Sequence, residues 1–176
     1  MTKKFTITGF EKFNETNTGI TTRFGGQPDW IDEPQWPQSS AWGRPMQIIC
    51  QIPLIHLDEN FGGKVAYIFA THASHPERDE FFDPDVIFLD GGENAVIIQT
   101  RGRASVPTRP DSSGPTLFAP DGTSIMFSPI LEPGTDPGFV CQDVFVTLSG
   151  EEQQRYFSAV EGSKIGGGPS IFSRRR

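Results

Sequence analysis

The chain has 176 residues and a formal net charge of −7. This length fits one domain, residues 1–176, which can bury a core without disulfides or a structural metal. The acidic balance argues against a general nucleic-acid binder, which needs a basic surface. No apolar run approaches the ~20 residues that span a bilayer. We therefore expect a cytoplasmic protein with no nucleic-acid partner, no membrane association and no cofactor.

The composition favours a mainly β fold, with antiparallel sheets, long loops and one or two short helices. The 15 Phe, 19 Gly and 15 Pro suit strands joined by turns better than a helical bundle. Apolar and alternating runs predict strands at 3–9, 20–24, 45–55, 64–70 and 95–99, with weaker candidates at 86–89 and 125–127. In the run 45–55, alternation puts two sets of side chains on opposite faces: Met46, Ile48, Cys50 and Ile52 on one, Gln47, Ile49 and Gln51 on the other.

A helix is predicted at about 150–160. Ser149 and Glu152 have the capping-box spacing, and Gly162 provides a C-terminal cap. The region 101–124, rich in Pro, Gly, Ser and Arg, is expected to be a long loop. Cys50 lies in an apolar run and is expected to be buried. Two cysteines, Cys50 and Cys141, without a Cys-x-x-Cys spacing fit a reducing compartment, and a single disulfide between them is the alternative.

The segment Thr22-Arg23-Phe24-Gly25-Gly26-Gln27-Pro28-Asp29-Trp30 has a counterpart in residues 163–171. Both run hydroxyl, basic, apolar, Gly, Gly, any residue, Pro, any residue, apolar. Two similar turns would explain the match. We favour an internal duplication, with a half-repeat boundary near 150–162.

At these residues the chain resembles the YwqG-like family, a bacterial family of uncharacterised function. The resemblance continues at 34–37, 45–52, 91–99, 114–117 and 164–167. The resemblance implies an antiparallel β architecture in two related halves. It also extends to an immunity-like role, in which the chain would bind a basic protein partner. Family members normally continue after the second Gly-Gly motif, so the resemblance implies a shortened or altered C-terminus. An incomplete second half would leave a strand edge open or covered by a partner.

The most suggestive candidate binding site is the proline-rich segment with three tryptophans, Trp30, Trp36 and Trp42. These rings line a groove for a ligand or peptide, with polar contacts from Asp29, Glu33, Gln35 and Arg44, or they anchor the loop on the sheet. We favour the anchoring role. Gln47 and Gln51, with Gln99 on another strand, are expected to bind the backbone of a loop such as 24–30. A polar ligand site is the alternative.

The histidines of the His72-Ala73-Ser74-His75 segment, with Asp79 and Asp83, are candidate ligands for a divalent metal. A solvated acidic turn explains the same residues. No nucleophile elbow or phosphate-binding loop is present.

The leading hypothesis is a non-enzymatic protein that binds a protein partner through the Trp-rich loop. The alternative is a metal-dependent hydrolase centred on His72 and His75. The sequence does not determine the oligomeric state.

Overall fold

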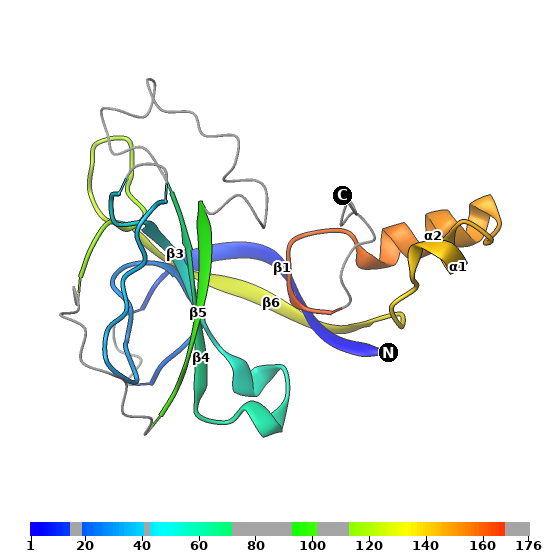
Figure 1. The fold of residues 1–176 in the computed structure, drawn as a ribbon, viewed down its shortest axis with the longest axis horizontal. Helices are drawn as coiled ribbons and strands as arrows, with labels where there is room; N and C mark the ends of the chain where they lie inside the picture. Colours follow the sequence, from blue (N-terminus) through cyan, green and yellow to red (C-terminus); the bar gives the residue numbers. More distant parts are fainter. Residues whose placement is uncertain (15–18, 41–42, 72–92, 102–112, 168–176) are drawn as a thin grey trace. The chain divides into compact units, whose positions relative to one another are not determined.

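The computed structural model describes residues 1–14, 19–40, 43–71, 93–101 and 113–167 (Figure 1). Within them the protein is mainly β, as the composition predicted. The strands are β1 (Thr2–Lys12), β2 (Arg23–Gly25), β3 (Gln47–Pro53), β4 (Lys64–Ala70), β5 (Asn94–Thr100), β6 (Met126–Asp136) and β7 (Lys164–Gly166). The helices are α1 (Gln142–Phe145) and α2 (Gly150–Val160), with 3-10 turns η1 (Leu54–His56) and η2 (Glu59–Phe61).

The seven strands are hydrogen-bonded in the order β5-β4-β3-β2-β6-β1-β7. The pairs β2–β3, β2–β6, β3–β4, β4–β5 and β1–β7 are antiparallel. The chain divides into two compact units: Glu11–Ser128, and Met1–Phe10 with Pro129–Arg176. The long strands β1 and β6 each have residues in both units. The predictions of a single domain and of a repeat boundary near 150–162 stay predictions.

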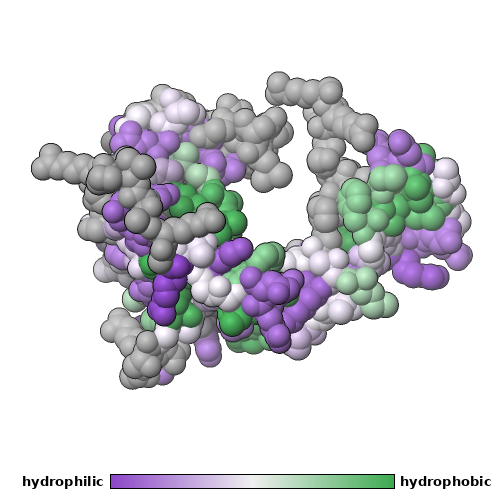
Figure 2. All heavy atoms as spheres, turned by 60° about the horizontal axis from the view of Figure 1, so that its bottom comes forward, coloured by the Kyte–Doolittle hydropathy of each residue, from purple (hydrophilic) through white to green (hydrophobic). Residues whose placement is uncertain are grey.

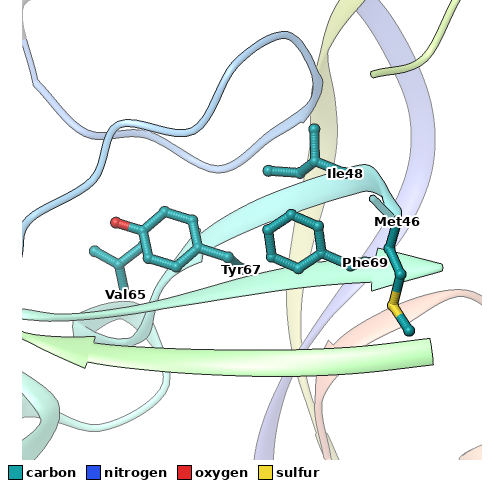
Figure 3. Packing of buried hydrophobic residues seen from close by; sticks show 5 residues of the cluster. All are labelled: Met46, Ile48, Val65, Tyr67 and Phe69. Atoms are coloured by element: carbon teal, nitrogen blue, oxygen red, sulfur yellow. The ribbon is translucent and has the colours of Figure 1, made fainter. Parts of the chain in front are cut away.

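The core of the Glu11–Ser128 unit stands on one face of β3 and β4. Figure 3 shows Tyr67 between Val65 and Phe69 on β4, with Met46 and Ile48 beside them. The rings of Tyr67 and Phe69 are fully buried. Partly buried side chains from the segment before β3 and from β5 complete this cluster: Ile20, Trp30, Ile31, Trp36, Ala95 and Ile97.

The expected alternation along residues 45–55 is wrong, because β3 contains an irregularity between Ile48 and Cys50. Ile48 is opposite Phe69, whereas Cys50 is opposite Ile68. Cross-strand neighbours share a face of the sheet, so the extra residue turns the rest of the strand over. Met46 and Ile48 therefore join the cluster of Figure 3, and Cys50 and Ile52 do not.

The same irregularity separates Gln47 from Gln51. Gln51 is opposite Tyr67 and lies on the core face, whereas Gln47 is opposite Ala70 and lies on the other face. Their predicted common face is thus also wrong. A bulge is invisible to a period-of-two pattern when both faces carry apolar residues.

In the other unit, α2 spans the predicted residues. The Ser149 hydroxyl caps the N–H of Glu152, and the Glu152 carboxylate accepts from the N–H of Ser149. The Ser149 hydroxyl also donates to this carboxylate at 2.8 Å, and this bond, together with the one from the Ser149 N–H, holds the pKa of the Glu152 carboxyl below its usual range. Phe145 of α1 packs against Tyr156 of α2 with ring centroids 5.9 Å apart. Hydrophobic surface also gathers over these helices (Figure 2), where Val144 and Val146 are each more than half exposed.

The two Gly-Gly segments noticed in the sequence have the same local backbone. Gly25 and Gly26 have φ values of 74° and 72°, and Gly166 and Gly167 have φ values of 78° and 82°. The first glycine of each pair is the last residue of a three-residue strand: Gly25 ends β2 and Gly166 ends β7. Consecutive left-handed residues of this kind explain why both segments need glycine. The duplication itself stays a prediction.

Prediction and structure differ most at the prolines. The sequence indicated only a short strand at 125–127, and prolines such as Pro129 and Pro133 argue against a longer one. In the structure, β6 nevertheless runs for 11 residues from Met126. The candidate strand 86–89 lies outside the described residues. In the described part of the chain, no helix is long and apolar enough to cross a membrane.

Candidate functional site

The site that the structure builds most completely is the segment 27–36, which we call the acidic loop after Asp29, Asp32 and Glu33. It follows the first Gly-Gly pair and lies over the core face of β3, β4 and β5. Those strands hold it by side chains rather than by strand pairing.

Gln51 of β3 holds the start of the acidic loop. Its Oε1 accepts the N–H of Asp29 at 2.9 Å, and its Nε2 donates to Asp29 Oδ2 at 2.8 Å and to the Thr21 carbonyl at 3.1 Å. Only 1% of Gln51 is exposed. A buried amide with all these bonds made stabilises the loop, and losing it would leave backbone groups unpaired.

Gln99 of β5 holds the middle of the acidic loop. Its Oε1 accepts the N–H groups of Ile31 and Asp32, both at 3.1 Å, and its Nε2 donates to the Glu33 carbonyl at 2.6 Å. The prediction that strand glutamines bind a loop backbone is confirmed for Gln51 and Gln99. Gln47, on the other face, also binds a loop backbone, because its Nε2 donates to the Thr116 carbonyl at 2.7 Å.

Tyr67 of β4 supplies the third attachment. Its hydroxyl donates a hydrogen bond to the Asp29 carbonyl at 2.7 Å and accepts one from the N–H of Ile31 at 3.2 Å. Burial raises the pKa of this hydroxyl to about 12, so it stays protonated and able to donate near neutral pH. The backbone from Asp29 to Glu33 is therefore bound to one side chain from each of three neighbouring strands.

The tryptophans face the core and anchor the acidic loop. The ring of Trp30 lies 4.6 Å from that of Tyr67 and stacks 6.2 Å from that of Phe69. Trp36 meets Phe69 edge-on at 5.3 Å, and its indole N–H donates to the Met46 carbonyl at 2.7 Å. These contacts match the anchoring role favoured from the sequence. Trp42 lies outside the described residues.

Beneath the loop, Arg23 of β2 is buried and charge-paired. Its Nη1 lies 2.7 Å from Asp29 Oδ2, and its Nη2 donates to the Gln27 carbonyl. The guanidinium also lies over the Phe13 ring, 5.5 Å from its centroid. The Asp29 side chain remains 42% exposed, so one side of this carboxylate faces solvent.

Glu93 is a structural carboxylate that the sequence analysis missed. Only 1% of it is exposed, and it accepts hydrogen bonds from the hydroxyls of Ser39, Ser40 and Thr71. Glu93 thereby ties the chain that follows the acidic loop to the end of β4. No local sequence signal indicated this role, because Ser39 and Ser40 lie 54 and 53 residues from Glu93 in the chain.

Arg44 is exposed, and its carbonyl accepts the N–H of Ser39 at 2.8 Å in a turn after the acidic loop. Among the described residues, no group of three His, Cys, Asp or Glu side chains is placed to hold a metal. The proposed metal ligands His72, His75, Asp79 and Asp83 lie outside the described residues. Burial raises the pKa of the Cys50 thiol to about 12, which makes it a poor nucleophile at neutral pH.

A cavity of about 390 Å³ lies in the unit that contains the helices. Its lining includes Tyr156 and Ala159 of α2 and Leu148, which precedes that helix. None of the candidate site residues that the structure describes lines it, so it gives no support to the Trp-rich groove.

Comparison with known protein families and with curated proteins found no match for this chain. The resemblance to the YwqG-like family therefore stays a prediction, and so does the shortened C-terminus that it implied.

Proposed function

We propose that this protein is a cytosolic, non-enzymatic binding protein that presents the acidic loop to a basic protein partner. The observation that carries the proposal is the attachment of residues 29–33 to Gln51, Tyr67 and Gln99. A loop already held in one conformation loses little entropy when it binds, so its contacts contribute more fully to affinity.

The charge of the acidic loop indicates the kind of partner. Asp29, Asp32 and Glu33 place three acidic residues within five positions, and Arg23 pairs with Asp29. All three residues are partly exposed. With a net charge of −7 on the whole chain, electrostatic attraction favours a basic surface and speeds its encounter.

The cytosolic location rests on the cysteines. Cys50 is buried, Cys141 is exposed, and both are free thiols. This fits a reducing compartment. Hydrolysis through His72 and His75 has no support from the described residues and stays a prediction.

The test is affinity capture from the source cell with wild-type protein and the charge-only variant Asp32→Asn/Glu33→Gln. Asn at 32 keeps the oxygen that accepts the Glu33 N–H at 2.8 Å, so the loop conformation is retained while the charges are lost. We expect wild type to enrich a basic protein, and the variant to bind it at least about tenfold more weakly. Added salt should weaken wild-type binding in the same direction.

The matched control is Glu132→Gln/Glu161→Gln, which removes the same charge from two exposed positions outside the loop. It should bind the partner as wild type does. Equal weakening by both double variants would indicate net charge rather than the loop. Undiminished binding by the loop variant would refute the proposal.

A further inference from the structure

β5 is an edge strand with unusual properties. It is the last strand of the order and pairs only with β4 among the described strands. Its sequence, Asn94 to Thr100, contains no charged residue and no proline. Val96 and Ile98 project from the same face and are 61% and 58% exposed. Natural edge strands are usually short, charged or interrupted, which prevents pairing with other chains.

The opposite end of the strand order shows that protection. β7 has three residues and includes Lys164. β5 has seven and none of these protective features. A long, uncharged edge with exposed branched apolar side chains is the form expected of a strand that pairs with another strand.

The backbone groups that β5 offers follow from its pairing with β4. The N–H of Thr71 donates to the Glu93 carbonyl at 2.7 Å, and the N–H of Arg101 donates to the Gly63 carbonyl at 3.1 Å. Hydrogen-bonded pairs alternate along an antiparallel ladder, so Ala95, Ile97 and Gln99 direct their backbone groups toward β4. The residues between them, Val96 and Ile98, direct theirs to the edge that no other described strand covers.

We propose that β5 pairs antiparallel with β5 of a second copy of this chain, about a two-fold axis at Ile97. In this register, Val96 of one copy and Ile98 of the other form two backbone hydrogen bonds with each other. The two-fold axis generates a second, identical pair between Ile98 of the first copy and Val96 of the second. The outward N–H and C=O groups of both residues are then satisfied together. The exposed Val96 and Ile98 side chains of both copies become direct cross-strand neighbours on one face.

Electrostatics favours this meeting point between two like-charged molecules. Each chain has a net charge of −7, so most approaches of two copies bring acidic surfaces together. The strand 94–100 carries no charge, and the proposed register places uncharged side chains opposite each other along the strand. The dimer is isologous and closed, which leaves no edge for further growth at this strand.

The experiment measures the mass of the full chain by analytical ultracentrifugation from about 1 µM to about 1 mM. We expect a reversible dimer. Val96→Pro removes one outward N–H without touching the ladder to β4, and edge strands tolerate proline at such positions. Val96→Lys/Ile98→Lys adds like charges that meet across the axis. Each variant should raise the dimer dissociation constant by roughly two orders of magnitude.

The control is Val144→Lys/Val146→Lys, which replaces two valines of similar exposure, 51% and 64%, by the same charges. It should dimerise as wild type does, and thermal unfolding should show that every variant is folded. A monomeric wild type across the range would overturn the proposal. So would a dimer that survives both β5 variants, or a β5 edge that pairs only with a strand of another protein.

Discussion

The two Gly-Gly corners of this protein, residues 23–26 and 164–167, have the same backbone and different surroundings. In both, a short strand ends in two glycines with positive φ, and a basic residue just before them pairs with an aspartate. In the first corner that aspartate is Asp29, which lies in the following loop and is 42% exposed. In the second it is Asp136 of β6, which is fully buried.

The second corner also holds more charge. Asp136 pairs with Lys164 and with Lys4 of β1, whose Nζ lies 2.7 Å from Asp136 Oδ1 and donates to the Ala159 carbonyl at 2.8 Å. The Lys4 and Lys164 side chains are only 16% and 12% exposed. The same turn thus serves two purposes. The buried ion cluster joins β1, β6 and β7, and the first corner presents a carboxylate to solvent.

The largest expected effect is that of Asp136→Asn. This change removes a charge that two nearly buried lysines share, which should lower the free energy of unfolding by about 3 kcal/mol or more. Urea denaturation measures it, with Glu132→Gln on the same strand as an exposed control. A loss below about 1 kcal/mol would show that the cluster contributes no more than a surface ion pair.

An intermediate effect is expected from adding a methyl group at each corner. Gly26→Ala and Gly167→Ala both place a side chain at positive φ, which costs about 1–2 kcal/mol. The new Cβ would also meet the Met126 side chain at the first corner and the Asp136 carboxylate at the second. Methionine is flexible and the carboxylate is held by two lysines, so Gly167→Ala should cost more.

Gly122→Ala separates strain from crowding in that comparison. Its φ is 83°, and apart from Gly122 and its two chain neighbours, no heavy atom of the described residues lies within 4 Å of the position where a Cβ would be. It should therefore show the cost of positive φ alone when thermal unfolding of the three variants is compared. Equal losses in all three would mean that neither corner is tightly packed.

The smallest effect is expected from Asp29→Asn. The Asp29 carboxylate is 42% exposed, so solvent screens its pairing with the buried Arg23, and asparagine keeps an oxygen for Gln51. The unfolding free energy should therefore fall by about 1 kcal/mol, less than for Asp136→Asn. Binding to a basic partner should weaken all the same. A stability loss as large as that of Asp136→Asn would make Asp29 a structural residue and remove the contrast between the corners.

Local signals in the sequence predicted much of this fold. The Ser149–Glu152 spacing located α2 because a capping box depends only on residues a few positions apart. The apolar run of β4 located that strand at its observed bounds, since a buried strand carries its own pattern. The repeated Gly-Gly pair indicated two similar turns because positive φ restricts the residue type wherever it occurs.

What the sequence alone determined is therefore the mainly β class, the central strands, the capped helix and the glutamines that bind the acidic loop. The tertiary structure decided which faces those residues occupy: a single bulge in β3 sends Gln47 and Gln51 to opposite sides. It also decided that Glu93 is buried under three hydroxyls, and it decided for Trp30 and Trp36 between the anchoring role and the groove that the sequence had left open. These outcomes depend on contacts between residues far apart in the chain, and neither spacing nor composition records them.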